Sequence, residues 1–319
     1  MINRIPENKA RSHILFSLRK SIILSEKIAS LSGKTLGPIY LTEFSDGEFQ
    51  PYFGKSIRGA NVFLISSTLP PSDNLMELLL ICDAAYRASA HYINVIITYL
   101  GWSRQDKKEK LRVPIGAKLA TNLLVTAKAT RVIVMDLHSN QIQAFFDIPV
   151  DQISASKIFM EYLQLLKRKK ITIASTDLGG AKRAKSYAIY LKSDIIICYK
   201  ERKRANSIEN MNCIGKVINR NVIFIDDMID TANTLVIAAN LIKKKGACSI
   251  RALVTHPILS ENAIEKIESS SIEELIVTDS IPFKKKLSSK IKVLSCAAIL
   301  ADVIHLVHNN ESISNYFIV

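Results

Sequence analysis

The sequence predicts an α/β protein made of two similar halves, and two observations carry this prediction. The run Val222-Ile-Phe-Ile225 is apolar and mostly β-branched, which is typical of a buried parallel strand. A polar loop follows it, and then an apolar, helix-like run over residues 235–242 that Gly246 ends. The second observation is an internal repeat, because residues 61–75 align without gaps on residues 221–235. Repeated strand–loop–helix units predict parallel sheets covered by helices.

The length fits two domains. The chain has 319 residues, of which 48% are hydrophobic and 23% charged, as in an ordinary soluble protein with two domains of about 150 residues each. The two copies of the repeat lie 160 residues apart (221 − 61), which matches the size of one domain. We therefore expect one domain over residues 1–150 and a second over residues 151–319.

Charge and cysteine content narrow the class of protein. The net charge is +14, but the basic residues are spread along the chain and few aromatic residues lie among them, so nucleic-acid binding is disfavoured. The need to bind substrates that carry several phosphates accounts for part of this positive charge. The five cysteines are widely spaced and contain no CxxC pair, which predicts free thiols in a reducing compartment. No signal peptide or membrane span is visible, and we expect a cytoplasmic protein without a membrane partner.

The loop after the strand of residues 222–225 has the chemistry of a sugar-phosphate site. Backbone N–H groups at a helix start suit a dianionic phosphate, and threonine hydroxyls add further donors. Carboxylates at the strand end can accept hydrogen bonds from sugar hydroxyls or lie near a magnesium ion. In the simpler interpretation, the acids merely end a strand and cap a helix. The strand, the paired acids and the loop together favour a ribose 5-phosphate site, which would be formed by Asp226, Asp227, Asp230, Thr231, Ala232, Asn233 and Thr234.

These residues resemble the phosphoribosyl-diphosphate binding motif that phosphoribosyltransferases share with ribose-phosphate diphosphokinases. The motif usually has glycine where this chain has Asn233. Asparagine tolerates left-handed backbone angles better than most residues, so we expect the loop to keep its shape. The first copy of the repeat has Ser66 and Ser67 in place of the two carboxylates, so only the second half is expected to hold the sugar.

Two segments of the first half are candidates for nucleotide binding. Residues 44–50 form a polar turn flanked by phenylalanines, which is either a plain surface turn or a site where Asp46 and Glu48 bind a base or sugar while a phenylalanine stacks on adenine. The charged run over residues 104–112 follows a strand, at the edge where ligands bind in parallel sheets. Arg104, with Gln105 beside it, could hold a triphosphate through bidentate hydrogen bonds, and the alternative is a solvated loop.

A buried strand over residues 132–135 delivers Asp136 and His138. A single histidine near an apolar run is more often a hydrogen-bonded core residue than a ligand. The whole stretch to Asp151, however, resembles the signature of ribose-phosphate diphosphokinases, and this resemblance implies that His138 is a magnesium ligand. Imidazole is an unusual magnesium ligand, so a coordinated water is the expected link.

Two segments of the second half complete the candidate site. Residues 171–180 predict a strand that opens into a glycine-rich turn, with Asp177 placed to meet a metal ion. The family usually has proline where this chain has Thr176, and the basic residues 182–185 read as a solvated face. The strand over residues 195–199 leads into a basic segment, which is a flexible charged loop or an arm that closes over a polyphosphate. By resemblance, Lys200 and Arg202 are the catalytic pair of that arm.

Taken together, the chain resembles ribose-phosphate diphosphokinases over residues 42–317. The resemblance implies two tandem phosphoribosyltransferase-like domains, each with a mostly parallel sheet flanked by helices. The implied reaction transfers the diphosphate of ATP to O1 of ribose 5-phosphate, giving phosphoribosyl diphosphate and AMP for nucleotide biosynthesis, with Mg²⁺ as cofactor. It also implies a homo-oligomer, a hexamer, whose nucleotide site is completed across a subunit interface. The ATP site would comprise Asp46, Gly47, Glu48, Arg104 and Gln105, and Arg202 would also contact the ribose phosphate.

Three other functions remain open at this point. A phosphoribosyltransferase would share the loop of residues 226–234 but consume phosphoribosyl diphosphate, and it would not need the stretch around His138. A non-catalytic regulatory homologue would not need His138, Asp177, Lys200 and Arg202, all of which are present. A nucleic-acid binder is supported only by net charge, and binding to random DNA that is absent or insensitive to salt would exclude it.

Overall fold

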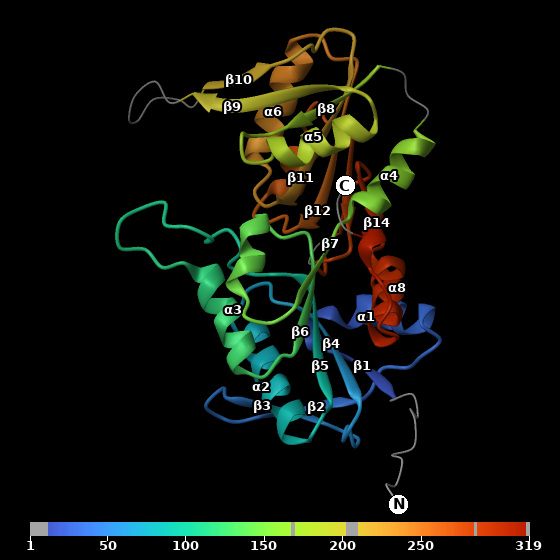
Figure 1. Ribbon diagram of the computed structural model, residues 1–319. Helices are drawn as coiled ribbons and strands as arrows, with labels where there is room; N and C mark the ends of the chain where they lie inside the picture. The colour runs from blue at the N-terminus through green and yellow to red at the C-terminus, as the bar shows by residue number, and fades with distance from the viewer. Residues whose placement is uncertain (1–11, 167–169, 202–209, 284–285, 317–319) are drawn as a thin grey trace, which may run out of the picture. The chain divides into compact units, whose positions relative to one another are not determined.

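The computed structural model describes residues 12–166, 170–201, 210–283 and 286–316 of the chain. The described part forms two compact units (Figure 1). The first contains the residues up to Ile153 together with the helix α8 (Ala297–His308). The second contains residues Ser154–Cys296.

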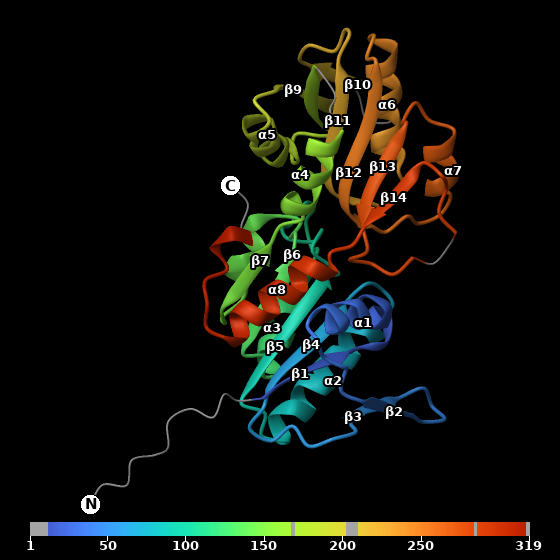
Figure 2. The same cartoon turned by 90° about the vertical axis from the view of Figure 1, so that its right-hand side faces the viewer.

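The first unit is built on a five-stranded sheet in which every neighbouring pair is parallel. Its strands, in spatial order, are β1 (His13–Ser17), β4 (Asn61–Ser67), β5 (Tyr92–Tyr99), β6 (Arg131–Met135) and β7 (Val150–Ile153). Helices α2 (Asp73–Arg87) and α3 (Gly116–Thr126) lie on one face, and α1 (Ile22–Leu31) and α8 lie on the other (Figures 1 and 2). A separate antiparallel hairpin joins β2 (Ile39–Glu43) to β3 (Phe49–Phe53).

The second unit has a seven-stranded sheet that is parallel except at one edge. Its strands, in spatial order, are β10 (Asn210–Ile214), β9 (Asp194–Glu201), β8 (Ile171–Ser175), β11 (Asn221–Ile229), β12 (Ser249–Pro257), β13 (Glu274–Thr278) and β14 (Ile291–Leu294). The strand β10 pairs with β9 in the antiparallel direction. The helices are α4 (Ser156–Leu165), α5 (Ala181–Tyr190), α6 (Asn233–Lys244) and α7 (Ala263–Glu268).

The central strand β11 shows why both faces of this sheet are covered. Val222 and Phe224 pack into a core shared with α6 and α7, while Ile223 and Ile225 pack into a second core shared with α4 and α5. Alternate residues of a strand point to opposite faces, so a run that is apolar at every position needs helices on both sides. The predicted fold class, an α/β protein with mostly parallel sheets flanked by helices, is confirmed.

The internal repeat of the sequence is also a repeat of structure. In the first unit the order β1-β4-β5-β6-β7 places the repeat copy β4 second, and in the second unit β11 is likewise second in the run β8-β11-β12-β13-β14, to which β9 and β10 are added at the β8 edge. Even the register agrees, because Asn61 lies opposite the first residue of β1 and Asn221 lies opposite the first residue of β8. The two halves are therefore built to one plan.

Helix α8 packs with the first unit although it follows the second in the chain. The predicted domain of residues 151–319 included it. Its contacts with the first unit include rings of His13 and His308, whose centroids are 3.9 Å apart, and a hydrogen-bond contact of 3.3 Å between Asn61 Nδ2 and His308 Nδ1. The chain thus returns to its first unit at its carboxyl end.

All five cysteines lie in the described part of the chain and are free thiols. No described helix combines the length and the apolar character needed to cross a bilayer.

Candidate functional site

The acidic end of β11 is part of the strand. The sequence predicted that the strand stops at Ile225, but β11 continues to Ile229, and Asp226 lies opposite Val254 of β12. The prediction was wrong about the boundary because β12 is equally long and supplies partners as far as Pro257. The two carboxylates consequently sit on a rigid, paired strand at the carboxyl edge of the sheet, where ligands bind in parallel α/β folds.

The loop between β11 and α6 adopts its left-handed turn one residue earlier than predicted. Ala232 is the N-cap residue of α6 and has φ 62° and ψ 0°. Asn233 is the first residue of the helix, so the idea that its tolerance of left-handed angles preserves the loop was wrong. Ala232 has no side chain that can cap the helix, and the N–H groups of the first turn remain available for an anion.

The paired acids at the end of β11 have different partners. Asp226 Oδ2 accepts a hydrogen bond of 2.7 Å from Thr176 Oγ1, and its Oδ1 accepts one of 2.9 Å from the backbone N–H of Asp227. Asp227 is buried, and its Oδ1 lies 3.8 Å from Nη2 of Arg183. Burial, followed by the charge of Asp227, raises the pKa of Asp226 to about 7, although the Thr176 hydrogen bond opposes the rise.

Arg183 was grouped with Lys182 and Lys185 as a solvated face, and for Arg183 this prediction was wrong. Lys182 and Lys185 are exposed, but the side chain of Arg183 is only 16% exposed and faces Asp227. Helical geometry separates these neighbours, because residues one and two apart on α5 point in different directions.

The carboxylate oxygens at the carboxyl edge of the second sheet are ligands of the kind that magnesium prefers. Asp177 is exposed, its Oδ1 accepts a hydrogen bond of 2.8 Å from the N–H of Gly180, and its charge also raises the pKa of Asp226. A divalent cation beside these oxygens would relieve their mutual repulsion, so the residues fit Mg²⁺. The described residues contain no ready-made group of three or more His, Cys, Asp or Glu that could hold a metal.

A neighbouring loop, which the sequence did not reveal, supports the phosphate loop. Between β12 and α7, Ser260 Oγ donates a hydrogen bond to Asp230 Oδ1, and Lys266 Nζ, on α7 itself, donates one of 3.2 Å to the carbonyl oxygen of Thr231. The N–H of Leu259 donates to the carbonyl oxygen of Ile229 at 3.1 Å. No local pattern marks Ser260 or Lys266, since their partners lie about 30 residues away in the chain.

The predicted catalytic pair falls at the edge of the described structure. Lys200 is exposed on β9 and lies opposite Met211 of β10, so it belongs to a paired strand and not to the loop that the sequence suggested. Arg202 lies outside the described residues. A lysine on a paired strand has a fixed Cα position, while its side chain can still reach solvent.

The first unit gathers a second set of predicted residues at one edge of its sheet. Arg104 and Gln105 follow β5, and His138 follows the adjacent strand β6; all three side chains are exposed. The N–H of Gly101 donates to Thr68 Oγ1 at 2.8 Å, and a Cβ on Gly101 would stand 2.3 Å from the carbonyl oxygen of Thr68. Only glycine allows this close approach of the ends of β4 and β5, and the approach fixes where the segment carrying Arg104 begins.

The remaining predicted nucleotide residues, Asp46, Gly47 and Glu48, form the exposed tip of the β2–β3 hairpin. Asp46 Oδ1 accepts a hydrogen bond of 3.0 Å from the N–H of Glu48, and Gly47 has φ 95°, which favours glycine. Of the two phenylalanines beside the tip, Phe44 is 48% exposed, whereas Phe49 is partly buried with the guanidinium of Arg19 over its ring at 5.2 Å. Phe44 is therefore the ring with more surface available to a base.

The second unit thus brings together Asp177, Asp226, Asp227, Asp230 and residues 231–234 at the carboxyl edge of one sheet. The first unit brings Arg104, Gln105 and His138 to the corresponding edge of the other sheet. In this chain, then, an uncapped helix start lies beside carboxylates in one unit, and basic and imidazole side chains lie at the edge of the other.

Comparisons with known proteins agree with this arrangement. Residues 13–127 match the model of the N-terminal domain of ribose phosphate pyrophosphokinase, and residues 202–318 match that of the phosphoribosyl synthetase-associated domain. The chain is 47% identical over 311 residues to a ribose-phosphate pyrophosphokinase of Porphyromonas gingivalis, covering 97% of this chain and 99% of that one. It is 48% identical over 293 residues to the ribose-phosphate pyrophosphokinase of Wolinella succinogenes, covering 92% and 94%.

A solved structure supports the same relationship. The phosphoribosylpyrophosphate synthetase of Mycobacterium smegmatis superimposes with a TM-score of 0.89 at 33% identity, covering 94% of this chain and 100% of that chain. Similarity of this extent includes both units and the segments that carry the candidate site. The chain belongs to the ribose-phosphate pyrophosphokinase family.

Proposed function

We propose that this chain transfers the β,γ-diphosphate of ATP to O1 of ribose 5-phosphate, yielding phosphoribosyl diphosphate and AMP. The observation that carries the proposal is the junction of β11 and α6, where an uncapped helix start lies next to the carboxylates that end the strand. Family membership supports the reaction, and the chemistry of this junction supports a site for the acceptor there.

The acceptor site is proposed at residues 226–234. The 5-phosphate would accept hydrogen bonds from the N–H groups of the first turn of α6 and from the hydroxyls of Thr231 and Thr234, which are partly exposed. Asp226 and Asp227 would accept hydrogen bonds from the ribose hydroxyls, because an ionised carboxylate accepts hydrogen bonds and donates none. Asp230, held by Ser260, would complete the sugar contacts.

The nucleotide is proposed to bind through the hairpin tip and the segment after β5. Phe44 would stack on the adenine, and Asp46, Gly47 and Glu48 would contact the base or ribose. Arg104 and Gln105 would contact the phosphates, for which the planar guanidinium is well suited. The family resemblance implies that two copies of the chain build this site, and we propose a homo-oligomer, a hexamer, which analytical ultracentrifugation would test.

In the chemical step, O1 of the sugar attacks the β-phosphorus in line. A new O–P bond forms while the bond from the β-phosphorus to the bridging oxygen of AMP breaks. Negative charge builds on the leaving oxygen and on the diphosphoryl group. Positioning and charge stabilisation supply most of the catalysis in such transfers, and Lys200 and Arg202 are proposed to provide the positive charge.

Mg²⁺ is the proposed cofactor. In the second unit Asp177 is proposed to hold Mg²⁺, and in the first unit His138 is proposed to contact Mg²⁺ through a water molecule; the bound ion would neutralise charge on phosphate oxygens. The negative charge of Asp227 raises the pKa of Asp226, and the same repulsion between the two carboxylates favours a cation near them.

The direct test is AMP release from ATP, measured with and without ribose 5-phosphate. We expect AMP only when both substrates and Mg²⁺ are present.

Lys200→Ala is expected to lower kcat by about 10²–10³, with little change in the KM for ribose 5-phosphate, because it removes charge stabilisation from the transition state. Lys216→Ala, another exposed lysine of the same unit, should leave kcat unchanged. Absence of AMP with both substrates would instead favour a non-catalytic regulatory homologue.

A further inference from the structure

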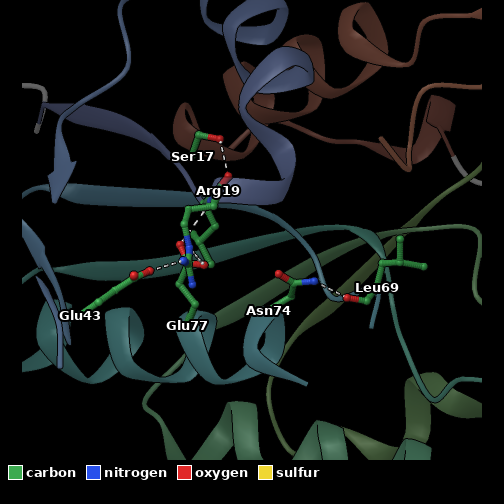
Figure 3. Close-up of polar contacts among 7 residues, drawn as sticks. Ser17, Arg19, Glu43, Leu69, Asn74 and Glu77 are labelled. Carbon is green, nitrogen blue, oxygen red and sulfur yellow. Dashed lines mark hydrogen bonds and ion pairs between the residues drawn. The ribbon is translucent and has the colours of Figure 1, made fainter. Parts of the chain in front are cut away.

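Arg19, the residue that follows β1 and Leu18, connects three elements of the first unit. Its Nε donates a hydrogen bond of 2.9 Å to Glu77 Oε2 on α2, and its backbone N–H donates one of 3.3 Å to Oε1 of the same carboxylate. Its Nη1 donates to Glu43 Oε1 on β2 at 3.2 Å (Figure 3). The guanidinium also lies over the ring of Phe49 on β3. One side chain therefore links the sheet, a helix and both strands of the hairpin.

The strong part of this connection is buried. The side chain of Glu77 is only 2% exposed, and a carboxylate in that position requires a cation and hydrogen-bond donors. Arg19 supplies both through its side chain and its own backbone, so its guanidinium has little freedom to move. The contact with Glu43 is different, because that side chain is 69% exposed and such pairs contribute little stability by themselves.

These contacts add to the apolar packing that orients the hairpin, in which Ile39 and Phe53 pack against the core of the first unit. The strands β2 and β3 pair only with each other, as a two-stranded sheet separate from the main one. A two-stranded hairpin is marginally stable in water, and its orientation is set by what it packs against. Glu43 and Phe49 form the last cross-strand pair before the tip of residues 44–48. Arg19 holds both members of that pair, at the base of the tip.

We infer that Arg19 is a positioning residue for the nucleotide: anchored by the buried Glu77, it fixes the β2–β3 hairpin so that the tip of residues 44–48 is oriented for ATP. This inference rests on the proposed role of that tip in ATP binding. Arg19 acts through Glu43 and Phe49, so its removal should weaken ATP binding without affecting the ribose phosphate site, which belongs to the other unit.

The test must separate positioning from stability. Arg19→Met alone would leave Glu77 buried without its cation and would lower the Tm. The double variant Arg19→Met/Glu77→Met replaces the buried Glu77 and its 43% exposed partner Arg19 by apolar side chains of similar length, so that no buried carboxylate is left without its cation. We expect a Tm close to that of the unmodified chain but a KM for ATP raised by about tenfold, since small misplacements of binding groups have effects of this size. The KM for ribose 5-phosphate should change less than about twofold.

Three single variants sharpen the result. Glu43→Gln keeps the buried pair but removes one link to the hairpin, and it should raise the KM for ATP by about threefold at unchanged Tm. Arg87→Met removes an arginine that pairs with Asp83 at 2.6 Å on the exposed face of the same helix, and it should leave both KM values unchanged. Arg19→Lys should retain the Tm but not the ATP affinity, because an ammonium group lacks the planar fork that reaches two carboxylates.

The inference is overturned if the double variant binds ATP like the unmodified chain, or if the KM values for both substrates rise together. Failure of the proposed function would look different. In that case the unmodified chain itself would release no AMP from ATP and ribose 5-phosphate, and the inference would fall with it.

Discussion

At the scale of single residues, the two departures from the family motif have different structural meanings. Thr176 stands where the family usually has proline, and its hydroxyl donates to Asp226 at 2.7 Å. Proline has no group that could make this hydrogen bond. Threonine at this position therefore gives Asp226 a hydrogen-bond donor that proline would lack, and Asp226 is the carboxylate whose pKa is raised by burial and by the charge of Asp227.

Thr176→Val is predicted to lower the free energy of unfolding at pH 8 by about 1–3 kcal/mol, because an ionised carboxylate loses a hydrogen-bond donor. The KM for ribose 5-phosphate should rise as Asp226 loses its orientation. Thr172→Val, on the strand β8 that Thr176 follows, is the matched control, since the buried Thr172 hydroxyl has no hydrogen-bond partner among the described residues. Equal effects of the two substitutions on Tm in thermal unfolding would contradict the assignment.

Asn233 is the second departure, and the structure changes what it is expected to do. Since the left-handed position is Ala232, restoring glycine at 233 places it in the first turn of a helix. We predict that Asn233→Gly lowers stability slightly, by less than about 1 kcal/mol, because glycine is a poor helix former. A gain in Tm would mean instead that residue 233 is strained in the unmodified chain.

At the scale of elements, helix α8 meets β1 at a group of basic side chains. His13 of β1 faces His308 and His305 of α8 and Lys34 beyond α1, with Phe63 and Asn61 of β4 beside it. Burial, followed by the charges of His308, Lys34 and His305, lowers the pKa of His13 from 6.5 to about 4. Protonation of His13 is therefore disfavoured in the folded state.

A pH dependence of stability follows. Well above pH 6.5, His13 is neutral in both the folded and the unfolded chain, so it adds nothing to the pH dependence of the free energy of unfolding. As the pH falls towards 4, the unfolded chain binds a proton that the folded chain does not, so stability decreases, by on the order of 2 kcal/mol. Because the raised pKa of Asp226 changes stability in the opposite sense over this pH range, the His13 contribution would be measured as the difference between the unmodified chain and His13→Gln in urea unfolding at pH 7.5, 5.5 and 4.5. His13→Gln should abolish this contribution between pH 6.5 and 4, and an unchanged slope in this variant would remove His13 from the explanation.

At the scale of the whole molecule, two copies of one α/β plan carry different chemistry. The second copy ends its repeat strand in Asp226 and Asp227, whereas Ser66 and Ser67 stand at the matching positions of the first and are each 1% exposed. Buried hydroxyls cannot receive a sugar. Duplication has thus supplied two sheets, of which one is proposed to hold the ribose phosphate.

We accordingly predict one binding site for ribose 5-phosphate per chain, measured by isothermal titration calorimetry without nucleotide. Asp227→Asn should weaken this binding, because a carboxylate that accepts from sugar hydroxyls loses its charge. Ser66→Ala should leave the stoichiometry and the affinity unchanged. A second equivalent of ribose 5-phosphate, bound even after the Asp227 substitution, would show that the first copy also binds it.

Local sequence determined much of this protein. The uninterrupted apolar run of residues 222–225 required a parallel strand covered on both faces. As the sequence predicted, Gly246 ends the helix that follows: α6 runs to Lys244, Lys245 is its C-cap residue, and Gly246 has φ 94°. The repeat at an offset of 160 residues predicted two copies of one α/β unit, and five strands of each sheet follow one order. The acids, threonines and helix start of residues 226–234 predicted the kind of ligand, because their chemistry is contained in one short segment.

Only the tertiary structure decided which residues support that segment. Thr176, Arg183, Ser260 and Lys266 reach residues 226–231 from other elements, and Arg19 meets Glu77 across 58 positions of the chain. The return of α8 to the first unit is of the same kind. Periodicity and motifs are local properties, whereas a hydrogen bond between distant segments depends on strand order and register, which the packing of the complete core fixes.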